Sequence, residues 1–213
     1  MENKNVSIQT LRRLPIYLHY LKTVKNMPNI SATLIAEALG LNDVQVRKDI
    51  GSVSGSGRPK TGYVTLELIR EIEAYLGCGE DNKTVLIGAG NLGKALLSYN
   101  GFLDYGLDVV AAFDVDSAVI GSDIGGKPVL SMAHLGEICK KYSIKLGIIT
   151  VPAAAAQTAC DELVSYGVEA IWNFAPTVLK VPAGVLVENE NLASSLAVLS
   201  KHLKQATREE KIK

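Results

Sequence analysis

Residues 84–93, TVLIGAGNLG, constrain the fold of this chain more than any other segment. A short β-branched run passes directly into the pattern G-x-G-x-x-G. Asp114 follows 21 residues after the last glycine, at the end of a second apolar run, VVAAFD. A strand, a glycine turn, a helix and a second strand ending in an acid are the parts of a dinucleotide-binding βαβ unit. We therefore expect an α/β domain built around this segment.

Strand-like and helix-like runs alternate through the chain after residue 80. Strands are predicted at 84–88, 109–113, 146–151, 169–172 and 184–188, and helices at 91–99, 131–142, 153–166 and 190–205. This alternation predicts a parallel sheet that helices cover on both faces. The predicted domains are a front domain over 1–80, a Rossmann domain over 81–188, and a C-terminal helix with a tail over 189–213.

The front domain has the element order of a winged helix-turn-helix. An apolar period over 8–26 predicts a first helix, in which Pro15 either makes a kink or lies in the first turn. Ser31 and Asn42 are the predicted N-caps of a second and a third helix. A glycine-rich loop at 51–62, the predicted wing, precedes a helix at 63–76.

The third helix is the predicted recognition helix, with Val44, Ile50 and Val53 holding it to the core and polar residues facing outward. Charge supports this interpretation. Residues 1–63 carry nine Lys and Arg against four Asp and Glu, whereas the remainder carries thirteen against eighteen. A basic front and an acidic body indicate that only the front meets a polyanion. A small helical interaction domain is the alternative. The candidate DNA-binding residues are Arg12, Asn42, Gln45, Arg47, Lys48, Arg58, Lys60 and Tyr63.

Each glycine of the nucleotide motif has a physical role. Gly88 permits the tight turn, Gly90 leaves room for a pyrophosphate, and Gly93 allows the helix to approach the strand. Asp114 can accept hydrogen bonds from ribose hydroxyls and repels a 2′-phosphate, which favours NAD over NADP. The loops IITVP and NFAP end later strands at the same sheet edge. The candidate cofactor-binding residues are Gly88, Ala89, Gly90, Asn91, Leu92, Gly93, Tyr99, Phe102, Asp114, Thr150, Val151, Pro152, Asn173, Phe174 and Ala175.

We expect neither catalytic residues nor a metal site. A hydride-transfer enzyme needs an acid or base over the nicotinamide, but His134 and His202 have the surroundings of surface residues. Three well-separated cysteines fit neither a zinc site nor a disulfide framework. No apolar run is long enough for a transmembrane helix, and no secretory signal is recognisable, so a cytoplasmic protein is expected.

Both halves together resemble one family, the Rex redox-sensing transcriptional repressors. The matching segments include LRRLPIYL, ALGLNDVQVRKDI, TGY, VLIGAGNLGKAL, FDVD, TVPAAAAQ and WNFAP. The resemblance implies a homodimer with an exchanged C-terminal helix. It also implies a palindromic operator that NADH causes the protein to release, with NAD⁺ as the competitor. A helix packed on its own domain is the alternative for the leucine stripe near the C-terminus.

The sequence departs from the family pattern at two places. The predicted wing has no phenylalanine. In the family, an acid at the start of the last helix pairs across the dimer with a tyrosine. Tyr99 matches that tyrosine, but Asn191 stands in the place of the acid. Two other functions remain open at this point. One is an NAD-dependent oxidoreductase with an added domain, and the other is a repressor whose ligand is a CoA derivative.

Overall fold

The computed structural model describes residues 6–59, 61–78 and 82–210, and the chain divides into two compact units. The first unit comprises Met1–Glu80 with Asp104–Gly106, and the second comprises Asp81–Leu103 with Leu107–Lys213. The predicted boundary at residues 80 and 81 lies outside the described residues, as does the end of the predicted tail at 211–213.

Four helices and a two-stranded sheet form the described part of the N-terminal unit. The elements are α1 (Ile8–Thr23), β1 (Asn29–Ile30), α2 (Ala32–Leu39), α3 (Asp43–Val53), β2 (Tyr63–Val64) and α4 (Thr65–Leu76). The predicted caps are confirmed: the Ser31 hydroxyl accepts from the Leu34 N–H, and the Asn42 side chain accepts from the Gln45 N–H. Each satisfies a backbone donor that the first helical turn leaves free.

The structure decides between the two alternatives for Pro15 and corrects one expectation for α3. Helix α1 starts at Ile8, so Pro15 lies inside the helix rather than in its first turn. On α3, Val46 and Ile50 are fully buried, whereas Val44 is 73% exposed. Residues four apart share a helix face, and Val44 lies six positions before Ile50, well off that face. The prediction that Val44 anchors α3 was therefore wrong.

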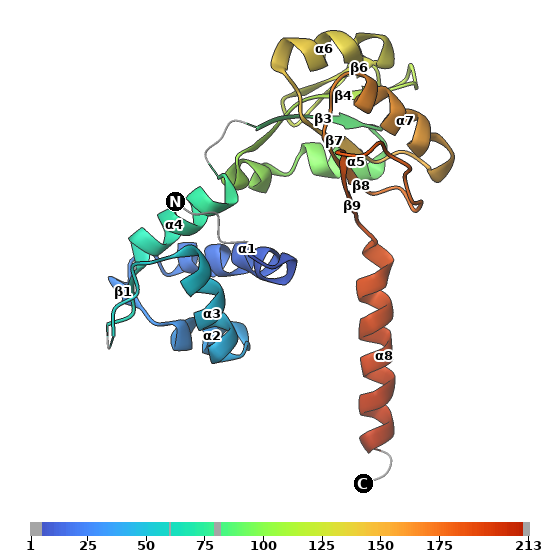
Figure 1. Ribbon diagram of the computed structural model, residues 1–213. Coiled ribbons are helices and arrows are strands. Elements are labelled where there is room, and N and C mark those ends of the chain that lie inside the picture. Colours follow the sequence, from blue (N-terminus) through green and yellow to red (C-terminus); the bar gives the residue numbers. More distant parts are fainter. Residues whose placement is uncertain (1–5, 60, 79–81, 211–213) are drawn as a thin grey trace. The chain divides into compact units, whose positions relative to one another are not determined.

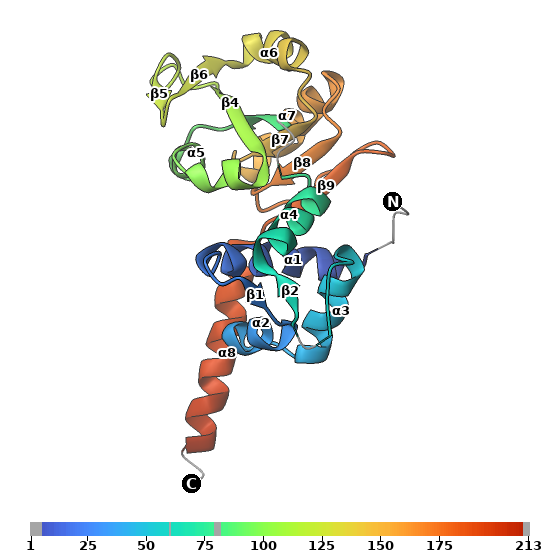
Figure 2. The same ribbon diagram turned by 90° about the vertical axis from the view of Figure 1, so that its left-hand side faces the viewer.

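The loop between α3 and α4 returns to the unit through β2. Strand β2 pairs antiparallel with β1, with Ile30 opposite Tyr63, and the two strands lie side by side in Figure 2. Within the loop, Arg58 bridges to Gly62. Gly62 has φ of +76°, and a Cβ there would lie 2.3 Å from the Ile30 carbonyl oxygen, so only glycine fits. A short sheet with such a loop is the wing of a winged helix.

The C-terminal unit contains a seven-stranded sheet in the order β5-β6-β4-β3-β7-β8-β9. Every neighbouring pair from β6 to β9 is parallel, and β5 joins the edge antiparallel. The strands are β3 (Asn82–Ile87), β4 (Leu107–Asp114), β5 (Asp123–Ile124), β6 (Lys127–Ser131), β7 (Leu146–Ile149), β8 (Ala170–Asn173) and β9 (Leu186–Asn189). The six parallel strands have the Rossmann order, with its reversal between β3 and β7.

Helices cover both faces of this sheet, as expected (Figure 1). They are α5 (Asn91–Leu97), α6 (Leu135–Tyr142) and α7 (Ala153–Ser165), with 3-10 turns at Asn100–Tyr105 and Met132–His134. Because side chains alternate along a strand, Val85 and Ile87 of β3 pack towards α6 and α7, whereas Leu86 packs towards α5. Sequence reasoning missed β5 and β6, which are short.

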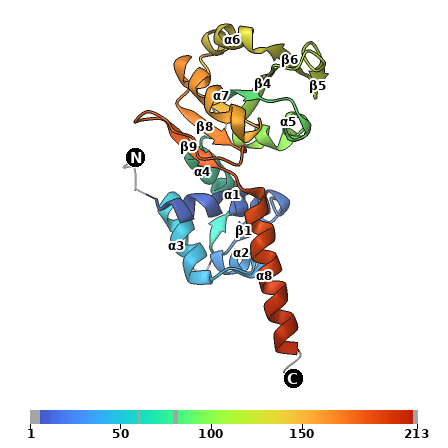
Figure 3. The same cartoon turned by 90° about the vertical axis from the view of Figure 1, so that its right-hand side faces the viewer.

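Helix α8 (Leu192–Glu210) follows β9 and is drawn in red in Figure 3. Leu196 and Leu199 on this helix are 67% and 64% exposed. Exposed leucines along one helix face are typical of a surface that another chain covers.

Candidate functional site

The glycine turn lies at the carboxyl end of β3, next to the point where the strand order reverses. Gly88 has φ of +101°, and a Cβ on Gly93 would lie 2.0 Å from the Gly88 carbonyl oxygen. By contrast, a Cβ on Gly90 would meet no heavy atom within 4 Å. Gly88 and Gly93 therefore serve the fold, whereas the space beside Gly90 is open. Of the other motif residues, Ala89 is buried and Asn91 is exposed.

Asp114, at the end of β4, holds the glycine turn from the adjacent strand. Its Oδ2 accepts from the Ala89 N–H at 2.7 Å, and its Oδ1 accepts from the N–H groups of Val115 and Asp116 at 2.7 and 2.9 Å. A carboxylate oxygen can accept two hydrogen bonds, so Oδ2 retains a position for a hydroxyl. The side chain thus fixes the turn and still faces the cavity described next.

A cavity of ≈ 370 Å³ lies beside the glycine turn, mostly apolar in its lining. It brings together six of the predicted residues: Gly88, Gly90, Asp114, Thr150, Val151 and Pro152. The Thr150 hydroxyl, 2.6 Å from the Gly88 carbonyl oxygen, ties β7 to the turn. Sequence reasoning missed the contribution of α7, where Ala155, Thr158, Ala159 and Glu162 line the same cavity. Their spacing of three and four residues on one helix face is the signal that could have revealed them.

An aromatic cluster joins the segment that follows α5 to the end of β8. Tyr99 meets Phe102 edge to face at 5.0 Å between ring centroids, Phe102 meets Trp172 at 5.7 Å, and Trp172 meets Phe174 at 4.6 Å. Three of these four residues were predicted, and Trp172 was missed. These rings form no part of the lining of the 370 Å³ cavity. The structure therefore separates the predicted cofactor residues into a glycine-turn group and an aromatic group.

Asn173 and Ala175 hold the NFAP loop rather than facing a cavity. Asn173 is fully buried. Its amide donates to the Thr177 carbonyl and to Asn189 Oδ1, both at 2.9 Å, and its Oδ1 accepts from the Ala175 N–H at 3.0 Å. These bonds occupy the side-chain amide, so Asn173 shapes the loop that carries Phe174.

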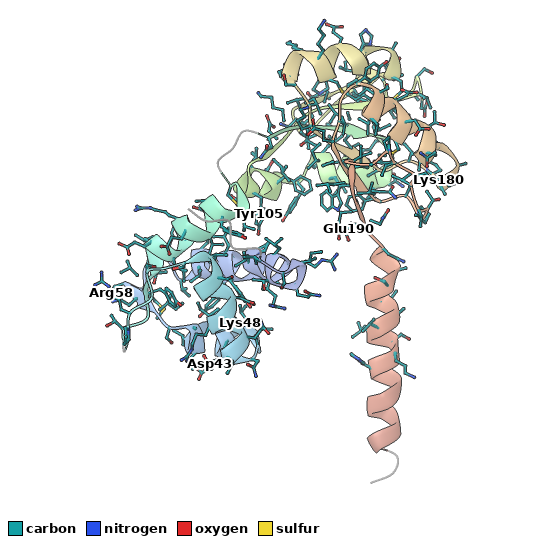
Figure 4. The ribbon with its side chains drawn as sticks, viewed as in Figure 1. Asp43, Lys48, Arg58, Tyr105, Lys180 and Glu190 are labelled. Carbon is teal, nitrogen blue, oxygen red and sulfur yellow. The ribbon has the colours of Figure 1, made fainter. Side chains whose placement is uncertain are left out.

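In the N-terminal unit, the predicted nucleic-acid residues lie on α3 and on the wing. Gln45, Arg47 and Lys48 are exposed on α3, as is Arg58 on the wing. Figure 4 labels Lys48 on the helix and Arg58 on the loop. Arg12 is exposed on α1, and Lys60 lies outside the described residues. Tyr63 is 9% exposed and packs in the core of the unit.

A groove of ≈ 460 Å³ lies between α2, α3 and the wing, and both Arg47 and Arg58 line it. The Arg47 guanidinium is oriented by Asp43, one turn earlier on α3, at 3.0 Å. The Thr33 hydroxyl donates to the same carboxylate at 3.0 Å. Two guanidinium groups beside one groove are suited to phosphate oxygens.

A buried carboxylate joins α3 to α1. Asp49, 1% exposed, accepts from the hydroxyls of Thr10 at 3.0 Å and Tyr17 at 2.8 Å, from Arg13 Nε at 2.6 Å, and from the Gln45 amide at 2.8 Å. Burial opposes ionisation, but these hydrogen bonds outweigh it and lower the pKa of Asp49 to about 2. We call these five residues the Asp49 cluster. Gln45, a predicted DNA contact, is exposed and also donates its amide to Asp49 one turn further along α3.

Among the described residues, no group of His, Cys, Asp and Glu side chains is arranged to hold a metal ion. The search for membrane spans, over the same residues, found no helix both long and apolar enough to cross a bilayer. The three cysteines are free thiols, and burial raises the pKa of Cys139 and Cys160.

Two family models match the chain, one in each half. The model described as "Putative DNA-binding protein N-terminus" matches residues 5–51, and the model described as "CoA binding domain" matches residues 79–177. They correspond to the winged helix and to the Rossmann unit.

Curated relatives named "Redox-sensing transcriptional repressor Rex" cover most of the chain. One from Treponema denticola is 44% identical over 89% of this chain and 91% of its own length. One from Streptomyces avermitilis is 38% identical over 98% of this chain and 83% of its own.

Solved structures agree with these relatives. RSP in complex with beta-NAD⁺ and operator DNA matches with a TM-score of 0.87 at 34% identity, over 99% of this chain and 98% of that one. RSP in complex with beta-NADH also matches with a TM-score of 0.87, at 33% identity, over 99% and 100% of the two chains.

Proposed function

Because the chain belongs to the Rex family of redox-sensing transcriptional repressors, we propose that it binds operator DNA through α3 and the wing and releases it when NADH occupies the Rossmann unit. It is a regulator rather than an enzyme, so the oxidoreductase alternative falls away. The observation that carries the proposal is the presence in one chain of a recognition helix with Arg47 and Lys48 exposed and of an open Rossmann glycine turn.

The glycine-turn group is the proposed binding site for the adenosine diphosphate half of the nucleotide. The free space at Gly90 accommodates the pyrophosphate, and the apolar cavity beside Ala155 and Ala159 accommodates the adenosine. Asp114 Oδ2 accepts from a ribose hydroxyl, and the negative charge of this side chain disfavours a 2′-phosphate. NAD, rather than NADP, is therefore the cofactor.

The aromatic group is the proposed contact for the nicotinamide. The ring of NAD⁺ carries a positive charge that NADH lacks, and burying that charge beside Phe102 and Phe174 is unfavourable. A ligand changes a conformational equilibrium only through different affinities for the two states. A preference of about 100-fold corresponds to about 2.7 kcal/mol, which is enough to change operator occupancy.

On the DNA side, α3 enters the major groove with Arg47 and Lys48 outward, and Arg58 on the wing contacts the flanking backbone or minor groove. Val44 joins this proposed interface. It is 73% exposed near the start of α3, where a thymine methyl group is the natural apolar contact. The arginine pair beside the groove holds phosphates.

We further propose that the protein acts as a cytoplasmic homodimer on a palindromic operator, since a two-fold DNA site matches a two-fold protein. The exposed face of α8 with Leu196 and Leu199 supplies the dimer contact. Asn191 takes the place of the family acid opposite Tyr99 and also caps α8, accepting from the Ala193 N–H at 3.1 Å.

An operator gel shift tests the proposal. The duplex is titrated with protein, and NADH, NAD⁺ or CoA is then added at equal concentrations. We expect NADH to release the DNA at concentrations where NAD⁺ leaves it bound. Equal release by both nicotinamide nucleotides rules out redox sensing. Release by CoA alone identifies CoA as the ligand, the remaining alternative from the sequence.

A further inference from the structure

We propose that Trp172 and Glu190 act as positioning residues that couple the aromatic cluster to the first turn of α8. The inference rests on the proposed function, because it assumes that NADH binds at this cluster. It adds the specific contact through which occupancy of the cluster reaches the dimer helix. Both residues lie in the C-terminal unit, and neither was predicted from the sequence.

Trp172 connects two sets of contacts. Its ring touches Phe102 and Phe174, at 5.7 and 4.6 Å between centroids, so any rearrangement of those rings around a ligand displaces it. On its other side, the indole N–H donates to Glu190 Oε1 at 3.1 Å. Both residues are half-buried, which keeps solvent from screening this charge-assisted bond fully.

Glu190 stands where β9 passes into α8, as Figure 4 shows. Its backbone N–H donates to the Asn173 carbonyl at 2.8 Å. Asn191 follows and caps α8, accepting from the N–H groups of Ala193 and Ser194 at 3.1 and 3.2 Å. A displaced Glu190 therefore carries the cap and the first turn of α8 with it.

A second bond braces the same junction without contacting a ring. The fully buried Asn173 donates to Asn189 Oδ1 at 2.9 Å. This side-chain bond and the backbone pairing of Asn173 with Asn189 keep the end of β9 attached to β8 while the Trp172 bond varies. With the Asn173–Asn189 bond fixed and the Trp172–Glu190 bond variable, α8 can pivot at this junction without detaching from β8. A pivot of α8 would change the arrangement of the two subunits in a dimer.

The test uses full-length protein and the operator gel shift, with the response defined as the ratio of operator affinities without and with saturating NADH. Trp172→Phe removes the N–H donor and keeps an aromatic ring, and Glu190→Leu removes the acceptor. We expect each change to reduce the response about ten-fold, because the net stabilisation from a hydrogen bond to a charged group corresponds to roughly that factor.

The double variant should reduce the response no further than either single change, since both remove the same bond. Glu190→Gln keeps an acceptor oxygen and should restore most of the response. Glu137→Leu, which removes an exposed acid from α6, is the matched control and should behave as wild type.

A direct measurement of NADH binding distinguishes a loss of coupling to the operator from a loss of NADH affinity. Trp172 is the one tryptophan of the chain, so quenching of its fluorescence by NADH reports binding in wild type and in Glu190→Leu. We expect the two dissociation constants to agree within about three-fold, whereas the operator responses differ about ten-fold.

The outcomes distinguish the two proposals. If wild type releases the operator with NADH and both single variants release it equally well, the coupling is refuted and the proposed function stands. If Glu190→Leu loses NADH binding itself, Glu190 is not a positioning residue. If wild type keeps its DNA at every NADH concentration, the proposed function fails and the coupling fails with it.

Discussion

Replacing Asp49 with Asn should loosen the recognition helix and leave its exposed Arg47 and Lys48 unchanged. Asp49 is 1% exposed, and its carboxylate is the shared acceptor of the Asp49 cluster. The amide of asparagine carries no charge and presents N–H donors to the donors of Thr10, Arg13 and Tyr17. In the variant, the donors that face the new N–H group are therefore left without an acceptor.

The magnitude follows from the pKa. The hydrogen bonds of the cluster lower the pKa of Asp49 from 3.8 to about 2 despite burial. Since each ten-fold change is about 1.4 kcal/mol, the charged form contributes about 2 kcal/mol at neutral pH. Breaking a fully buried ion pair costs about 3–5 kcal/mol. Arg13 is 24% exposed and regains water, so we expect the lower figure of about 2 kcal/mol.

Hydrogen exchange measures the effect within each unit. In Asp49→Asn, the slow amides of α1 and α3 should exchange about thirty-fold faster, whereas those of β3 should keep their rates. Asp43→Asn is the matched control on the same helix. Its pair with Arg47 is largely exposed, so the change should cost under about 0.5 kcal/mol. Unchanged exchange in α1 and α3 of Asp49→Asn would refute the reasoning.

The same carboxylate predicts a pH dependence. Its folded-state pKa is depressed, so its contribution is complete above the unfolded value near 4 and is lost as the pH falls through about 2. Acid titration of wild type, followed by circular dichroism, should therefore show the loss of this stabilisation between about pH 4 and pH 2, and Asp49→Asn should show no such loss.

Three further changes test the other parts of the molecule. Gly90→Val should fold, because its side chain enters open space, but should abolish NADH binding by calorimetry while operator binding persists; NADH binding at wild-type affinity would exclude the proposed pyrophosphate position. Gly93→Ala should instead destabilise the Rossmann unit, since its Cβ would lie 2.0 Å from a carbonyl oxygen, and a melting temperature equal to wild type would contradict the close helix–strand approach. Leu199→Asp should convert dimers to monomers in light scattering, and an intact dimer would mean that α8 does not form the interface.

Much of the fold could be read from local patterns. The glycine spacing, the caps at Ser31 and Asn42, and the alternation of apolar runs depend on residues within one or two turns of one another. Such features are determined by backbone sterics and near-neighbour hydrogen bonds, so they are readable in sequence. Short edge strands such as β5 and β6 carry too little pattern to be recognised, because pairing with a neighbour stabilises them.

The sequence by itself thus determined the two kinds of unit, the glycine turn and the recognition helix of a basic front domain. Tertiary structure decided which side chains meet. It brought Asp49 of α3 to Thr10, Arg13 and Tyr17 of α1, and it brought Trp172 to Glu190, 18 residues along the chain. Contacts of this kind depend on the relative placement of whole elements, which packing in three dimensions sets and no local periodicity records.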